Sequence, residues 1–203
     1  MSQPSPKDLS FKGSSPGHPF RHSLILTLEY QACTALSLAW AQSYDTKDWD
    51  LLSTIVTPEL HIDYRSVMGP THIWPSMSAA AYVAMMSSPS ALGNPLVATQ
   101  HILGLSSFER TAEDEITGTL QARAHHLRFA SDGCGDANGF GKGTGRKVLA
   151  SATGHAMLKH FYKRTREGTW KLAGLQPTVL FDDGDLKALL TLKEEVSAGA
   201  VQP

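Results

Sequence analysis

The feature that most constrains the fold is a series of long segments, beginning near residue 98, in which apolar and polar residues alternate. In residues 115–129, EITGTLQARAHHLRF, every second residue from Ile116 to His126 falls on one face, and this face is apolar or small up to Ala124. Such alternation is typical of a β-strand with one buried and one solvated face. Residues 100–108 and 148–162 alternate similarly, and residues 169–181 predict a last strand. We therefore predict a run of long antiparallel strands.

The first half of the chain instead predicts helices. From about residue 22 to 43, apolar residues recur in steps of three and four, which marks one face of a helix. The residues on this face are Ile25, Leu28, Ala32, Leu36, Trp40 and Tyr44. Asp45 is predicted to cap a second, short helix (46–56), which Pro58 ends. A third helix follows Pro75, with Ser76 or Ser78 as its N-cap, and a C-terminal helix is expected from about 185 to 196.

Helices first, then long strands, then a helix make an α+β pattern. Small residues occupy much of the predicted inner face of the sheet, and they leave room that larger residues would fill. They are Gly118, Ala122, Ala124, Ala150, Ala152, Gly154 and Ala156. A curved sheet wrapped by the helices would therefore enclose a mostly apolar pocket, which is the usual make-up of a small-molecule site.

The chain of 203 residues is long enough for one well-packed domain. We place this domain at residues 22–197, after a flexible N-terminal arm at 1–21 that is rich in Pro, Ser and Gly and does not resemble a signal peptide. A glycine-rich stretch at about 131–147 interrupts the strands. It matches neither a P-loop nor a dinucleotide-binding pattern, so we interpret it as an inserted, mobile hairpin loop at the rim of the sheet.

Charge and composition argue against several other classes of protein. The formal net charge is −1 and the basic residues are scattered, so no nucleic-acid partner is expected. The most apolar stretch, residues 24–40, is interrupted by Glu29 and Gln31, which does not favour a membrane span. The two cysteines form no disulfide pattern, which is typical of a reducing compartment. We expect a soluble, cytoplasmic protein.

Four polar side chains are predicted to point into the pocket: Tyr44 on the first helix, Tyr64 on a strand at 59–66, and His101 and His126 on the long strands, with Asp45 beside Tyr44. Taken singly, an inward histidine or tyrosine is more often a hydrogen-bonded core residue. Together they suit proton abstraction next to a ketone. Two histidines can exchange a proton near neutral pH, a carboxylate bonded to one would fix its tautomer, and two phenols can donate to a carbonyl oxygen.

Competing chemistries have less support. His101, His126 and Asp45 also suit a metal site, but no H-x-H or H-E-x-x-H spacing accompanies them, so no metal is predicted. No motif around either cysteine predicts a nucleophile, and no G-x-S-x-G is present. His155 and His160 fall on opposite faces of one strand, so we expect His155 to be solvated and His160 to lie near the end of the sheet.

Several ordered stretches resemble one known family. WAQSYDTKDWDLL, IDYRS, TQHILG, HHLRF and HFYKRTREGTWKLAGLQP resemble scytalone dehydratase and its scytalone dehydratase-like relatives, within the SnoaL/NTF2-like fold, from about residue 30 to 190. The resemblance implies a cone: a strongly curved mixed or antiparallel sheet wrapped by N-terminal helices, with a C-terminal helix covering the pocket. It also implies a homotrimer that needs no metal or organic cofactor.

The same resemblance implies roles for individual residues. Tyr44 and Tyr64 would activate a substrate carbonyl through a bound water, His101 and His126 would be the acid/base pair, and Asp45 would orient His126. Further positions that match the lining or cover of the family's pocket are Met85, Val179 and Leu186.

Two positions depart from the family pattern inside the predicted pocket. A serine and an asparagine of the family's late strand correspond here to Ala156 and Leu158. Both fall on the inner face, so we infer a different, less polar or larger substrate. We predict a cofactor-independent dehydratase acting on an aromatic polyketide with a naphthol- or anthrone-type ring in fungal secondary metabolism. The alternatives are an isomerase or cyclase that uses the same histidines, and a non-catalytic ligand-binding module.

Overall fold

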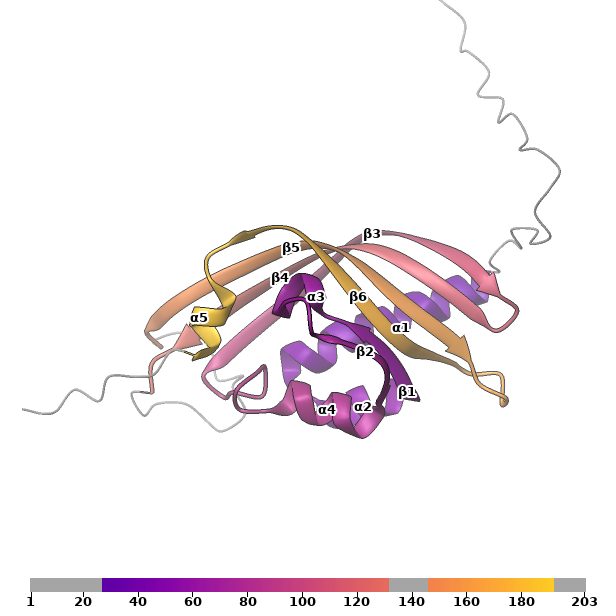
Figure 1. The fold of residues 1–203 in the computed structure, drawn as a ribbon, viewed down its shortest axis with the longest axis horizontal. Coiled ribbons are helices and arrows are strands. Elements are labelled where there is room, and N and C mark those ends of the chain that lie inside the picture. Colours follow the sequence, from indigo (N-terminus) through magenta and orange to yellow (C-terminus); the bar gives the residue numbers. More distant parts are fainter. Residues whose placement is uncertain (1–26, 132–145, 192–203) are drawn as a thin grey trace, which may run out of the picture.

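The long strands form one curved sheet, and the helices lie on its concave side (Figure 1). The computed structural model describes residues 27–131 and 146–191. The strands are β1 (Val56–Asp63), β2 (Ile73–Ser78), β3 (Val97–Ala112), β4 (Glu115–Phe129), β5 (Val148–Arg164) and β6 (Trp170–Asp183), in the order β2-β1-β6-β5-β4-β3. Neighbouring strands are antiparallel except β1 and β6, which are parallel. The predicted α+β class and the curved mixed sheet are confirmed.

The helices are α1 (Thr27–Thr46), α2 (Trp49–Ile55), α3 (Arg65–Met68), α4 (Ala79–Ser87) and α5 (Leu186–Thr191). Ser78 caps α4, as predicted, by accepting a hydrogen bond from the amide of Ala81 at 3.2 Å. The predicted cap at Asp45 is wrong. Because α1 continues through Thr46, the N-cap of α2 is Asp48, whose carboxylate accepts from the amide of Leu51 at 2.8 Å.

Parts of the prediction lie outside the described residues: the arm at 1–21, positions 132–145 of the glycine-rich stretch, and the C-terminal helix beyond residue 191. No helix within the described part of the chain is both long and apolar enough to cross a membrane.

The inner face of the sheet follows the predicted alternation through β4. Ile116, Leu120 and His126 are buried there, while Gln121 and Arg123 are exposed. Alternation through residues 100–108 would put Leu105 on the same face as His101, but Leu105 on β3 is 83% exposed. A register shift between Leu103 and Ser106 inserts an irregularity in β3, and it turns Leu105 away from the core.

The buried face of α1 also differs from the predicted face. Leu28 is 77% exposed, whereas Ser37 is buried. The Ser37 hydroxyl lies 2.9 Å from Nδ1 of His160 and 2.6 Å from the hydroxyl of Tyr162, both on β5. His160 is therefore a core residue rather than a residue at the end of the sheet. A polar residue such as Ser37 can face the core because groups on a distant strand form hydrogen bonds with its hydroxyl.

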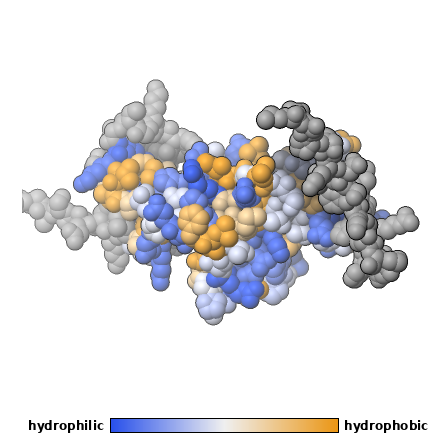
Figure 2. All heavy atoms as spheres, turned by 90° about the horizontal axis from the view of Figure 1, so that it is seen from above, coloured by the Kyte–Doolittle hydropathy of each residue, from blue (hydrophilic) through white to orange (hydrophobic). Residues whose placement is uncertain are grey.

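The outer face of the sheet is not uniformly polar. Seen from above in Figure 2, hydrophobic groups lie next to hydrophilic ones on this side of the molecule. Phe181 and Leu180 on β6 are each about 60% exposed. The ring of His155, which was expected to be solvated, stacks on Phe181 with 4.2 Å between ring centroids.

Two buried histidines predict how stability depends on pH. Burial lowers the pKa of His160 from 6.5 to about 3, and burial together with the charge of His101 lowers the pKa of His126 to about 4. The unfolded chain binds protons at these rings below about pH 6.5, and the folded chain does not. The free energy of unfolding should therefore fall as the pH drops through this window, by up to about 1.4 kcal/mol per pH unit for each ring.

Urea unfolding at about pH 7 and about pH 5 measures this dependence, with His160→Asn as the comparison. The variant lacks one of the two titrating rings, so its stability should change less between these pH values, whatever its absolute stability. An equal change in the variant and the unaltered chain would contradict the assignment to His160.

Candidate active site

A cavity of about 170 Å³ lies between the concave face of the sheet and the helices. Its wall is mostly apolar, and the small residues predicted for the inner face leave the space. Those that line it are Ala122, Ala124, Gly154 and Ala156. Four of the predicted polar residues, Tyr44, Tyr64, His101 and His126, also line it. The structure therefore brings together side chains from α1, from the start of α3 and from two long strands.

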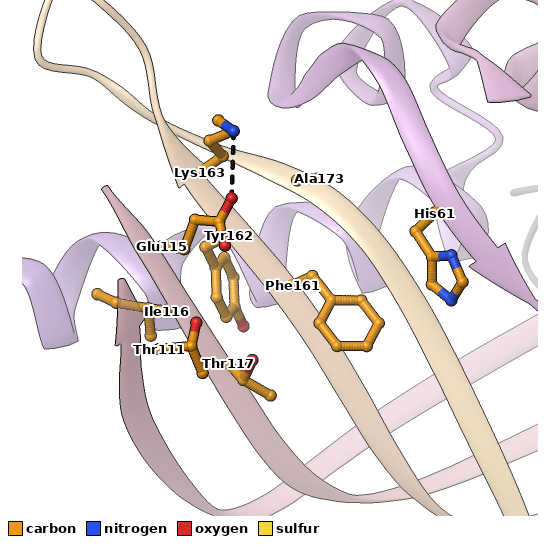
Figure 3. A pocket seen from close by; sticks show the side chains of 9 residues that line it. All are labelled: His61, Thr111, Glu115, Ile116, Thr117, Phe161, Tyr162, Lys163 and Ala173. Atoms are coloured by element: carbon orange, nitrogen blue, oxygen red, sulfur yellow. Dashed lines mark hydrogen bonds and ion pairs between the residues drawn. The ribbon is translucent and has the colours of Figure 1, made fainter. Parts of the chain in front are cut away.

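A second hollow, of about 370 Å³, lies on the opposite face of the sheet (Figure 3). Thr117 and Phe161 line it from neighbouring positions on β4 and β5, next to an ion pair in which Lys163 lies 3.1 Å from Glu115. Its one histidine, His61, packs edge-on against Phe161 and has no second histidine beside it among the lining residues. Of these two hollows among the described residues, the inner cavity is the one that combines phenols with two histidines.

The phenols of the cavity form one buried cluster. The hydroxyl oxygens of Tyr44, in the last turn of α1, and Tyr64, which precedes α3, are 3.2 Å apart. The hydroxyl of Tyr82 on α4 lies 2.5 Å from that of Tyr44, and it accepts a hydrogen bond from Nε1 of Trp40 at 3.2 Å. Burial raises the pKa of all three tyrosines, so they remain neutral and can donate hydrogen bonds.

Asp45 holds His101 with both of its carboxylate oxygens. Oδ1 lies 2.7 Å from Nδ1 of His101, and Oδ2 accepts a hydrogen bond from its backbone amide at 2.8 Å. The hydroxyl of Thr99 also donates to Oδ1, at 3.0 Å. Because the carboxylate accepts the proton on Nδ1, the neutral ring carries its lone pair on Nε2. His101 can therefore accept or return a proton at Nε2.

The prediction that Asp45 orients His126 is wrong in this structure. Asp45 lies in the last turn of α1, next to β3. Thr99 and His101, two residues apart on β3, both form hydrogen bonds with its carboxylate. His126 lies on β4, one strand further from this contact, and pairs in register with Thr99. The carboxylate therefore meets the histidine of the nearer strand.

His126 lies next to His101 on the wall of the cavity but in a different environment. The two ring centroids are 5.9 Å apart and the rings meet edge to face. His126 is only 4% exposed. Burial, and then the charge of His101, lower its pKa to about 4, so the ring is neutral at pH 7. The site thus contains a histidine paired with a carboxylate and a histidine that is kept neutral.

The predicted wall residues Ala156, Leu158, Val179 and Leu186 all line the cavity, but Met85 does not. Its neighbour Met86 takes this place and lies with its sulfur 3.9 Å from the hydroxyl of Tyr64. The reason is helical geometry: Tyr82 and Met86, four residues apart, share the buried face of α4. Met85 lies beside this face and packs against the core as a partly buried residue.

Tyr82, Met86 and Asp182 are among the residues of this region to which sequence reasoning gave no role. Tyr82 and Met86 were predicted to lie in a helix but were given no role. Their spacing of four residues indicates that they share one face of that helix. Asp182 on β6 lines the cavity as an exposed carboxylate opposite Gly154 of β5. No periodic signal marks Asp182, because it lies where β6 approaches its end.

Within residues 27–131 and 146–191, no three His, Cys, Asp or Glu side chains are grouped so that they could hold a metal ion.

The family model described as scytalone dehydratase matches residues 25–196. A dehydratase of Pestalotiopsis microspora is 40% identical over 151 residues, which cover 74% of this chain and 86% of the relative. Scytalone dehydratase of Colletotrichum orbiculare is 35% identical over 79% of this chain and 78% of the relative. Scytalone dehydratase of Pyricularia oryzae is 37% identical over 72% and 77%.

Solved structures share the fold at much lower identity. A putative scytalone dehydratase from Novosphingobium aromaticivorans aligns with a TM-score of 0.59 at 13% identity, covering 78% of this chain and 88% of the other. A hexachlorocyclohexane dehydrochlorinase from Novosphingobium barchaimii aligns with a TM-score of 0.56 at 13% identity, covering 78% and 91%. These likenesses concern the fold alone.

Proposed function

The chain belongs to the scytalone dehydratase family, and on this premise we propose that it is a hydro-lyase of fungal polyketide metabolism. Its substrate is a hydroxylated, partly reduced aromatic polyketide with a naphthol- or anthrone-type ring, from which elimination of water restores aromaticity. The observation that carries the proposal is the placement of a carboxylate-bound histidine and a neutral histidine in one apolar cavity, beside two phenols.

The two histidines divide the proton transfers between them. His126, which is neutral, takes the proton next to the substrate carbonyl, and the electron pair of that C–H bond forms an enolate. The bond to the hydroxyl on the neighbouring carbon then breaks as the enolate collapses. His101, whose positive charge Asp45 stabilises when the ring is protonated, donates its proton to the departing hydroxyl, which leaves as water.

Tyr44 and Tyr64 stabilise the charge that develops on the carbonyl oxygen. Both are neutral phenols whose hydroxyls meet at the wall of the cavity. They donate hydrogen bonds to the oxygen, directly or through a water, and such donors act more strongly in an apolar site than in bulk water.

The cavity wall narrows the choice of substrate. Ala156 and Leu158, where the family pattern has a serine and an asparagine, offer no side-chain hydrogen bond. A substrate hydroxyl buried against them would lose its partners in water without replacement, at a cost of about 1–3 kcal/mol. The substrate should therefore be apolar on this side of the ring.

Incubation of the purified chain with a small panel tests the proposal. The panel contains scytalone, a reduced emodin-type hydroquinone and a non-phenolic β-hydroxy ketone, and mass spectrometry detects loss of water. We expect one aromatic member to lose water and the β-hydroxy ketone to remain. A panel that stays unreacted with the unaltered chain contradicts the proposal and favours a ligand-binding module.

Isomerisation or cyclisation is the second candidate, because the same histidine pair could direct the enolate to ring closure instead of elimination. Its signature in the same experiment is a product of unchanged mass with a new retention time. The homotrimer that the family resemblance implies stays a prediction, which sedimentation of the purified chain measures.

A further inference from the structure

Tyr82, which the proposed mechanism does not use, lies directly behind the phenols of the cavity. It is fully buried and is not among the residues that line the cavity. Its hydroxyl connects Trp40 on one side, at 3.2 Å, with Tyr44 on the other, at 2.5 Å. Tyr44 in turn lies 3.2 Å from Tyr64. We call these four hydrogen-bonded side chains, Trp40, Tyr82, Tyr44 and Tyr64, the phenol relay.

Trp40 sets the direction of the hydrogen bonds in the phenol relay. An indole N–H can only donate, so the oxygen of Tyr82 accepts from it. The proton of Tyr82 needs an acceptor as well, because a buried hydroxyl proton without one is unfavourable. The hydroxyl of Tyr44, at 2.5 Å, makes the short contact with this hydroxyl, and Tyr64 also interacts with it. We take Tyr44, the partner at the shorter distance, as the acceptor of the Tyr82 proton, which leaves the proton of Tyr44 for Tyr64 or for a group in the cavity.

We propose that Tyr82 is a positioning residue, which directs the proton of Tyr44 into the cavity and toward a substrate carbonyl; the identity of that carbonyl rests on the proposed function. A hydroxyl that already accepts a hydrogen bond is polarised and donates more strongly. Without the hydroxyl of Tyr82, Tyr44 loses the donor that polarises it, so its own hydrogen bond to the carbonyl oxygen is weaker when charge develops there.

The kinetic test is Tyr82→Phe, which removes the hydroxyl and keeps the ring. For the panel member that the unaltered chain dehydrates, we expect kcat to fall about tenfold while KM stays within about twofold, because Tyr82 does not touch the substrate. Tyr162→Phe is the matched control. Tyr162 is also buried and its hydroxyl bonds Ser37 at 2.6 Å, but it lies outside the cavity. This control should retain its kcat although it also loses a buried hydroxyl.

A second readout does not depend on turnover. The carbonyl stretching band of bound 1-tetralone, an aromatic ketone with no hydroxyl to eliminate, reports the strength of the hydrogen bonds that it accepts. We expect the band to lie at lower frequency in the unaltered chain than in an apolar solvent. In Tyr82→Phe the band should shift to higher frequency, to a position between the bands of the unaltered chain and of Tyr44→Phe. In Tyr162→Phe the band should stay where it is in the unaltered chain.

The outcomes separate the two proposals. An unchanged band together with an unchanged kcat in Tyr82→Phe overturns the positioning role, as does the absence of a lowered band in the unaltered chain. A band that responds to Tyr82, in a chain that dehydrates no panel member, supports the positioning role and overturns the dehydration. If Tyr82→Phe does not fold, Trp40→Phe replaces it, because this change removes the donor at the start of the phenol relay.

Discussion

Replacing His126 with alanine is expected to lower kcat by roughly 10³-fold and leave the chain folded. His126 is the ring that burial keeps neutral, and the proposed mechanism assigns it the removal of the proton next to the carbonyl. The substitution only enlarges an existing cavity, so the fold should persist. Turnover of the reactive panel member gives the rate, and circular dichroism reports the fold. If the alanine variant keeps a near-normal rate, the assignment of His126 as the base is wrong.

His125→Ala is the matched control for this variant. His125 is the neighbouring residue on β4, but it faces the other side of the sheet, where its Nδ1 lies 2.7 Å from the hydroxyl of Thr153. The control removes the same ring from the same strand outside the cavity. Its rate should stay close to that of the unaltered chain.

The pH profile gives a second check on His126. The base must be unprotonated, and burial together with the charge of His101 lowers its pKa from 6.5 to about 4. The rate should therefore persist as the pH falls below 6.5 and decline only toward about pH 4. An acid limb centred near 6.5 would mean that an ordinary histidine titrates in the reaction, contrary to the burial of this ring.

Asp45→Asn is the second change with a large expected effect, a fall in kcat of about 10²- to 10⁴-fold. An amide in place of the carboxylate can present its NH₂ group to Nδ1 of His101. The ring then carries its proton on Nε2 instead of Nδ1, and the positive charge of the protonated ring loses its partner. Steady-state kinetics on the reactive panel member measure the loss, which should appear in kcat rather than in KM.

Asp48→Asn is the control for the carboxylate. It makes the same chemical change three residues along the chain, at the N-cap of α2, where asparagine caps as well as aspartate. Asp48→Asn should therefore keep both its stability and its rate. If Asp45→Asn behaves in the same way, His101 does not depend on its carboxylate, and Asp45 has only a structural role between α1 and β3.

Periodicity located the polar groups of the site before their contacts were known. Period-two alternation put His126 on the inner face of β4 and His125 on the outer face, and both placements are confirmed. Steps of three and four put Tyr44 at the buried end of α1, where it is 2% exposed. Backbone geometry imposes both periods, so they can be deduced from the order of residues alone.

The prediction was wrong where a local irregularity or a distant partner decides the outcome. The register shift in β3 turns Leu105 outward, and no pattern of residues in the sequence predicts this shift. The family resemblance implied that Met85 lines or covers the pocket, but the rotation of α4 places Met86 there. A helix turns by about 100° per residue, so an assignment that is one position off points to a different neighbour.

The sequence by itself determined the α+β fold, the small-residue inner face and the inward direction of Tyr44, Tyr64, His101 and His126. Each of these follows from the chain's own periods and side-chain volumes. Only the tertiary structure decided which histidine is hydrogen-bonded to Asp45. It alone also showed that the hydroxyl of Tyr82 contacts the hydroxyl of Tyr44. Both contacts join segments 38 or more residues apart. The distance between such groups depends on how α1 and α4 pack against the sheet, which is set by the whole core and not by any local pattern.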